Sequence, residues 1–175
     1  MNFRKNLKNI SLFLFFAFCL ILVVLYIRSQ IPKVSLIHQN SSTSSNPPVI
    51  TTAKVTRVID GDTIVIDTSQ KVRYIGMNTP ELETNDCFAT QAAEINKTLV
   101  LGKEVKLEKD VSETDKYGRL LRYVYINNEM INDDLVKDGS AKIETVPPDV
   151  KYKQEFLNSE KYAQENKLGL WGKCL

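Results

Sequence analysis

The most continuous hydrophobic stretch of the chain lies near its N-terminus. Residues 10–27 are apolar at all 18 positions except Ser11, and three basic side chains precede them. At about 1.5 Å per residue, a helix of this length spans about 27 Å, close to the hydrocarbon core of a bilayer. Basic residues before such a segment favour a cytoplasmic N-terminus. The pattern therefore predicts a cytoplasmic segment over residues 1–9 and a transmembrane anchor over residues 10–27.

A cleaved signal peptide is the alternative for residues 10–27. The run is long for a signal peptide, and the residues around Arg28 show no small-x-small cleavage pattern. Residues 28–51 include the run HQNSSTSSNPP, which has no periodicity and no apolar face, so we expect a flexible tether there. We therefore expect the rest of the chain to lie outside the cytoplasm, either anchored in the membrane or secreted after cleavage.

From residue 52 the pattern changes to short runs of alternating polar and apolar residues, rich in β-branched side chains. Such alternation predicts β-strands. The turn signal Asp60-Gly61 joins the first two strands as a hairpin, and Pro80 follows the third because proline cannot donate a hydrogen bond to a sheet. The five expected strands cover residues 52–59, 62–67, 71–77, 104–110 and 120–126.

Three further segments have apolar residues at helical spacing. The first places Ala92, Ile95 and Leu99 on one face and ends at Gly102. The expected helices cover residues 89–101, 130–137 and 149–167. Five short strands with packed helices predict an α+β fold over residues 52–175: a five-stranded OB-type Greek-key β-barrel with three α-helices.

Charge and histidine content narrow the possible chemistry. All 21 acidic residues follow position 50, against 18 lysines and arginines, so the expected domain has a net charge of −3. A stable nucleic-acid-binding protein is usually basic, whereas an enzyme with transient contacts needs only a local positive site. The single histidine, His38, lies in the expected tether. This excludes mechanisms with a histidine base from the folded part.

Polar residues gather at three places where expected strands end. The segment Asp60-Gly61-Asp62-Thr63 is by itself typical of a hairpin turn. Arg73 lies among apolar residues. It is either a buried cation that needs an anion or an outward-facing surface arginine. The run Asp115-Lys116-Tyr117-Gly118-Arg119 is either a solvated turn or a cationic pair beside an aromatic ring, which suits a phosphate and a base or sugar.

These residue types suit the hydrolysis of phosphodiester bonds. A hard cation held by carboxylate and carbonyl oxygens neutralises the anionic substrate. A carboxylate can orient or deprotonate the attacking water, and two arginines can hold the phosphate oxygens in the transition state. Asp62, Glu81, Arg73 and Arg119 supply this set without a histidine.

Four motifs occur in a specific order along the folded part: DGDT, R-x4-NTPE, DKYGR and GLWG. Between about Val55 and Trp171, this order resembles the staphylococcal nuclease (thermonuclease) family. The resemblance implies an OB-fold barrel with three helices. It also implies calcium-dependent hydrolysis of DNA and RNA that leaves 3′-phosphate ends.

The resemblance implies a Ca²⁺ site as well. Asp62 matches the first calcium carboxylate of the family, and Thr79 matches the residue that gives a backbone carbonyl to the metal. Asn78 stands where the family has its second calcium aspartate. The stretch after Glu81 is shorter and less basic than in the secreted archetype, and an aromatic residue that would stack a base near Thr145 is absent. These departures concern metal affinity and substrate binding more than the type of reaction.

The remaining site residues are carried over in the same way. Arg73 and Arg119 match the two phosphate-binding arginines of the family. Glu81 matches the carboxylate proposed as its general base. Lys116 and Tyr117 match residues that contact the terminal phosphate of bound nucleotide inhibitors.

Two cysteines, Cys87 and Cys174, belong to the expected domain, and they form no CxxC pair. This argues against zinc or thioredoxin-like chemistry. Outside the cytoplasm two such cysteines can pair, so we expect a disulfide that ties the C-terminus to the barrel. Two unpaired thiols are the alternative.

The prediction is therefore a monomeric, calcium-dependent nuclease that acts on DNA or RNA and is attached to the membrane by its N-terminal helix. One alternative is a non-catalytic OB-fold module that binds nucleic acid or protein. Another is a cell-surface protein whose motif residues only cap turns. Retention of both arginines, Glu81 and Asp62 favours the enzyme.

Overall fold

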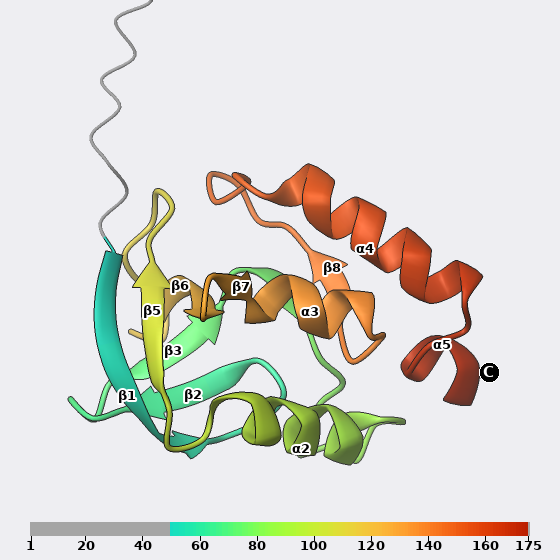
Figure 1. Cartoon of the computed structure of the whole chain (residues 1–175), viewed down its shortest axis with the longest axis horizontal. Coiled ribbons are helices and arrows are strands. Elements are labelled where there is room, and N and C mark those ends of the chain that lie inside the picture. Colours follow the sequence, from blue (N-terminus) through green and yellow to red (C-terminus); the bar gives the residue numbers. More distant parts are fainter. Residues whose placement is uncertain (1–49, 175) are drawn as a thin grey trace, which may run out of the picture. The chain divides into compact units, whose positions relative to one another are not determined.

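The computed structural model describes residues 50–174 (Figure 1). The expected cytoplasmic segment and membrane anchor lie outside these residues, as does the tether up to residue 49. Within the described residues, no helix has the length and apolar character needed to cross a membrane. The membrane anchor therefore stays a prediction.

Five strands close into a barrel. Neighbouring strands are antiparallel in the order β3-β2-β1-β5-β6, and a parallel pairing of β3 with β6 closes the sheet. The barrel and its helices match the OB-type α+β architecture expected from the sequence. The barrel strands are β1 (Ile50–Val58), β2 (Thr63–Ile66), β3 (Lys71–Tyr74), β5 (Glu104–Glu108) and β6 (Leu120–Ile126).

Apolar side chains at every second strand position fill the barrel, because alternate residues of a strand point to the same side of the sheet. On β3, Val72 and Tyr74 are buried. On β5, Val105 and Leu107 are buried and the intervening Lys106 is exposed. Burial of each such large apolar side chain contributes about 1.5–3 kcal/mol to stability.

The expected third strand, residues 71–77, is wrong as a single element. The chain turns after β3, and a separate strand, β4 (Gly76–Asn78), pairs with β8 (Lys142–Glu144) in a two-stranded sheet. Gly76 has a φ of +85°, and a Cβ there would lie 2.2 Å from the ring of Phe156. Glycine is therefore required both for the backbone conformation and for the space. The turn leads β4 away from the barrel sheet.

The three expected helices are all present, although not every boundary agrees with expectation. α2 (Ala89–Val100) and α3 (Ile131–Lys137) begin and end within a residue of the expected ranges. α4 (Lys153–Glu165) begins later than expected, because the Asp149 carboxylate accepts the backbone N–H groups of Val111 and Ser112 and so holds that residue in a turn. Figure 1 shows α3 between the barrel and α4. Two short elements were not expected: β7 (Glu129–Met130) and α5 (Leu170–Lys173).

A buried carboxylate ties the start of α4 to the barrel. Glu108, on β5, forms an ion pair with Lys151. It also accepts the hydroxyl groups of Tyr125 at 2.7 Å and of Tyr152 at 3.1 Å. Burial raises the pKa of Glu108, but the hydrogen bonds from Lys151 and the two tyrosines lower it more, so the pKa lies below its ordinary value.

Candidate functional site

Asp62 lies at the centre of the site. A Cβ at Gly61 would lie 2.5 Å from the Thr79 methyl, so glycine lets the turn before β2 pack against Thr79. Asp62 is only 4% exposed. Its Oδ2 accepts the Thr79 backbone N–H at 2.9 Å and the Thr79 hydroxyl at 3.1 Å, while Oδ1 accepts the Thr63 hydroxyl at 3.0 Å. A buried carboxylate needs such partners to offset the loss of solvation.

Arg73 points into the site rather than out to solvent. Its side chain is 12% exposed, and Nη1 lies 2.8 Å from Asp62 Oδ2. Nη2 donates to Asn78 Oδ1 at 2.6 Å and lies 3.5 Å from Glu144 Oε2. Asp62, Arg73, Asn78 and Thr79 therefore form one connected group, although they come from β3, β4 and two loops.

Asp60 is a site residue that the sequence analysis treated only as part of a turn. Its Oδ1 accepts the Asp62 backbone N–H at 3.0 Å. Burial, and then the neighbouring Asp62 carboxylate, raise the pKa of Asp60 from 3.8 to about 6. The sequence feature that could have indicated this role is the pair of aspartates on either side of Gly61, which places two carboxylates in one tight turn.

Arg119 approaches the same place from the turn between β5 and β6. Asp115 organises this turn: its Oδ1 accepts the backbone N–H groups of Tyr117 at 2.9 Å and of Arg119 at 3.0 Å. Its Oδ2 lies 2.6 Å from Arg119 Nε. Arg119 Nη1 then lies 3.5 Å from the hydroxyl of Thr63, the residue next to Asp62. Both arginines thus contact the start of β2, Arg73 at Asp62 and Arg119 at Thr63.

A cleft of about 520 Å³ opens beside the two arginines. Arg73, Arg119, Lys116 and Tyr117 all line it. The Tyr117 ring is 73% exposed, and Lys116 Nζ lies 5.0 Å from its centroid. Apolar side chains, among them Leu121, Val146 and Pro147, also line the cleft. A cleft of this size with cationic and aromatic walls fits a nucleotide unit.

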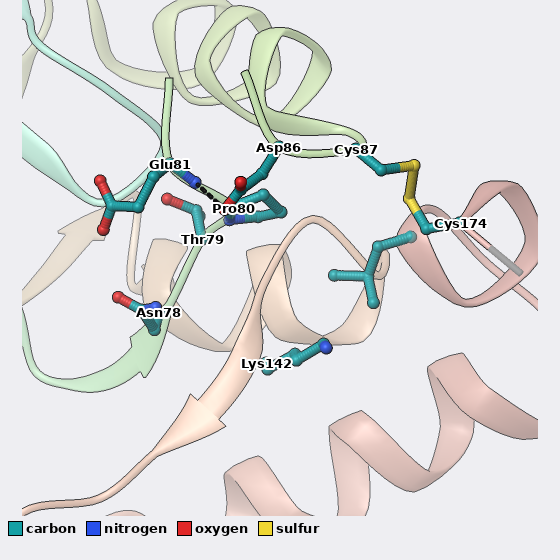
Figure 2. A pocket seen from close by; sticks show the side chains of 9 residues that line it. Asn78, Thr79, Pro80, Glu81, Asp86, Cys87, Lys142 and Cys174 are labelled. Carbon is teal, nitrogen blue, oxygen red and sulfur yellow. Dashed lines mark hydrogen bonds between the residues drawn. A yellow bond between two sulfur atoms is a disulfide. The ribbon is translucent and has the colours of Figure 1, made fainter. Parts of the chain in front are cut away.

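Glu81 lies in a neighbouring hollow of about 310 Å³ that also includes Asn78, Asp86 and Lys142 (Figure 2). The Asp86 carboxylate accepts the Glu81 backbone N–H at 3.2 Å. Among residues 50–174, the Glu81 carboxylate has no hydrogen bond or ion pair. The structure therefore does not join Glu81 directly to the group around Asp62, and it leaves this carboxylate free to meet water.

A disulfide borders this hollow. The sulfur atoms of Cys87 and Cys174 lie 2.05 Å apart, and Figure 2 shows the bond between the segment before α2 and the chain end after α5. The pairing expected from the sequence is thus present in the structure. The bond attaches the C-terminus to the segment that follows Glu81.

The oxygen donors at this place suit a hard cation. Asp62 offers a carboxylate, Asn78 an amide oxygen and Thr79 a backbone carbonyl, with the Glu81 carboxylate two residues further along. Ca²⁺ takes such oxygen ligands, whereas zinc prefers sulfur and imidazole. Within the described part of the chain, no three acidic, histidine or cysteine side chains converge to hold a metal ion. In this structure the Arg73 guanidinium donates to two of these groups, the Asp62 carboxylate and the Asn78 amide oxygen.

Comparison with known proteins identifies the family of this chain. Residues 71–173 match the family described as staphylococcal nuclease homologue. The Thermonuclease of Staphylococcus hyicus is 38% identical over 127 residues, which cover 69% of this chain and 75% of that protein. The Thermonuclease of Staphylococcus intermedius is 39% identical over 124 residues, 67% of this chain and 74% of that protein.

A third relative comes from another genus. Endonuclease YncB of Bacillus subtilis is 38% identical over 139 residues, which cover 74% of this chain and 66% of that protein. The family match includes Arg73, Asn78, Thr79, Glu81 and Arg119. The chain therefore belongs to the staphylococcal nuclease homologues.

Proposed function

We propose that this chain is a calcium-dependent nuclease that hydrolyses phosphodiester bonds of DNA or RNA outside the cytoplasm. Phosphodiester hydrolysis follows from membership of the family and from relatives named Thermonuclease and Endonuclease. The observation that carries the proposal is one cleft with two guanidinium groups beside a buried carboxylate.

The arginines account for substrate binding. Phosphate accepts hydrogen bonds from a planar guanidinium in a bidentate manner, so Arg73 and Arg119 can hold the oxygens of one phosphate from two sides. Lys116 adds a point charge, and the exposed Tyr117 ring offers a surface for a base or sugar. These contacts strengthen as negative charge develops on the phosphate oxygens during the reaction.

Calcium and a carboxylate supply the rest of the proposed chemistry. Asp62, Asn78 and Thr79 would hold the ion. When bound, Ca²⁺ neutralises the phosphate and polarises it toward attack. Glu81 carries a carboxylate that is exposed and unpaired among the described residues, which suits the orientation or deprotonation of the attacking water.

The proposed location rests on the sequence. The apolar residues 10–27 and the basic residues before them support a single membrane anchor, with secretion after cleavage as the alternative. A reporter fused after Leu175 should then lie outside the cytoplasm. Recovery of a soluble extracellular form that begins near residue 30–45 would instead indicate cleavage.

A non-catalytic binding module is the second candidate. It would use the same cleft to bind nucleic acid without cutting it. The retained carboxylates, Asp62 and Glu81, favour the enzyme, because binding of an anionic polymer alone is not helped by acidic residues beside the phosphate. A test of cutting separates the two candidates directly.

The test measures cleavage of plasmid DNA and of RNA with calcium and with a calcium chelator. Arg119→Ala should lower the rate by about two to three orders of magnitude, the usual cost of one lost charge contact to a transition state. Arg57→Ala, an exposed arginine on β1, is the matched control and should cut at the parental rate. If folded Arg119→Ala cuts as fast as the parent, or the parent cuts equally well without calcium, the proposal is wrong.

A further inference from the structure

The Arg73 guanidinium has more acceptors than a phosphate-binding arginine requires. Two of them lie inward: Asp62 Oδ2 at 2.8 Å from Nη1, and Asn78 Oδ1 at 2.6 Å from Nη2. The Tyr74 backbone carbonyl also accepts from Nη1, at 3.4 Å. The remaining acceptor lies at the cleft, where Glu144 Oε2 is 3.5 Å from Nη2 and the Glu144 side chain is 55% exposed. Glu144 is held there by strand pairing, because its partner across β4 and β8 is Gly76, close to Arg73 in the chain.

The two inward acceptors, the Asp62 carboxylate and the Asn78 amide oxygen, are groups that the proposed calcium site also uses. A divalent cation at Asp62 and Asn78 would repel a guanidinium in direct contact with them. Arg73 must therefore give up these acceptors, at least in part, when the cation binds. This step, and the inference that follows, rest on the proposed function.

A largely buried guanidinium without an anion is costly. In the substrate-bound enzyme the phosphate provides that anion. In the cation-loaded enzyme without substrate, the carboxylate that contacts Arg73 and does not belong to the cation site is Glu144. We propose that Glu144 is a positioning residue: it receives Arg73 when the cation binds, and it holds the guanidinium in the cleft until a phosphate replaces it.

This role makes Glu144 act oppositely on cation and phosphate. It stabilises the cation-loaded protein without substrate, and it competes with phosphate for Arg73. Removal of its charge should weaken calcium binding to the free protein and tighten phosphate binding to the calcium-loaded protein. The factor by which each ligand tightens binding of the other should therefore increase. By thermodynamic linkage this factor is the same whether calcium or phosphate binding is measured.

Glu144→Gln tests this, because it keeps the shape of the side chain and removes the charge. Calcium binding is measured by titration calorimetry, first on the free protein and then with a saturating nucleoside 3′,5′-bisphosphate. The calcium Kd of the free protein should rise about two- to fivefold, as expected for one partly exposed carboxylate–guanidinium contact. The change should be smaller with the bisphosphate present. At saturating calcium, KM for DNA should fall while kcat is retained.

Glu104→Gln is the matched control, since it removes one exposed acidic charge from β5 and its strand partner is Lys54 rather than a site residue. Equal calcium Kd values for the parent and Glu144→Gln would overturn the inference alone. Equal shifts in Glu144→Gln and Glu104→Gln would also overturn it, because net charge would then be the cause. A parent that neither binds calcium nor cuts would overturn the proposed function, and this inference with it.

Discussion

Asn132 carries a stability prediction that can be worked out from its contacts. This α3 side chain is 0% exposed. Its Oδ1 accepts the Val124 backbone N–H at 2.9 Å, and its Nδ2 donates to the Ile75 carbonyl at 2.9 Å and to the Arg122 carbonyl at 3.3 Å. Ile75 is the residue at which the chain leaves β3 for β4, so Asn132 fixes the turn that presents Asn78.

The expected cost of Asn132→Ala comes from two backbone groups. The Arg122 carbonyl still accepts the Ile75 backbone N–H at 3.0 Å in the variant, so it is not left unpaired and adds little to the cost. The Ile75 carbonyl and the Val124 N–H each lose the partner that Asn132 provided in a buried place. An unpaired buried polar group costs about 1–3 kcal/mol, so the free energy of unfolding should fall by about 2–6 kcal/mol.

Denaturant unfolding followed by circular dichroism measures this loss. Asn158→Ala is the control, because Asn158 is exposed on α4 and its side chain accepts a hydrogen bond from Gln154 at the surface, so its loss should change stability by no more than about 0.5 kcal/mol. At a temperature where Asn132→Ala stays folded, its calcium binding should also weaken, since the turn before β4 is less well held. Unfolding of Asn132→Ala within 1 kcal/mol of the parent would refute the reasoning.

Three other perturbations have defined outcomes. Asn78→Asp should tighten calcium binding and shift the activation curve to lower calcium concentration. The gain in affinity should be smaller than for an unpaired carboxylate, because the Arg73 guanidinium, 2.6 Å from Asn78 Oδ1, pairs with the new charge. An unchanged calcium titration at fixed ionic strength would show that Asn78 is only a turn residue. Replacement of Cys87 and Cys174 by serine should lower stability by no more than about 4–5 kcal/mol, the chain-entropy limit for so long a loop, and mass mapping of the parent without reductant should find the bridge rather than free thiols. The pKa of Glu108 lies below its ordinary value of 4.5, because hydrogen bonds outweigh the effect of burial, so its carboxylate stabilises the fold above that pH and the contribution is lost as pH falls through the lowered pKa. Glu108→Gln should therefore unfold more easily at pH 7 and show a flatter loss of stability in acid, and a parallel pH profile would contradict this.

Short-range patterns were sufficient for most of the fold. Alternation on either side of Asp60-Gly61 predicted β1 and β2, and helical spacing predicted α2 to within a residue. Both signals are local, because strand and helix periods depend on neighbours a few positions away. The order of the four motifs was likewise enough to identify the family, since it needs only the residues and their spacing.

The break after β3 could not be read in this way. The polar–apolar alternation of residues 71–74 ends at Tyr74, but it does not show that the chain turns there or that Gly76 packs against the ring of Phe156. Phe156 is on α4, far along the chain, so no local pattern reports the contact. β8 is three residues long and becomes a strand only through its pairing with β4.

The same long-range pairing decided the arrangement of the site. The motifs named Asp62, Arg73 and Asn78, but not that one guanidinium binds both of the other side chains. Glu144 belongs to none of the motifs, and it reaches Arg73 because β8 lies beside β4. Residue types at fixed spacing follow from the sequence, whereas competition among charges for one partner depends on distances that only the folded chain sets.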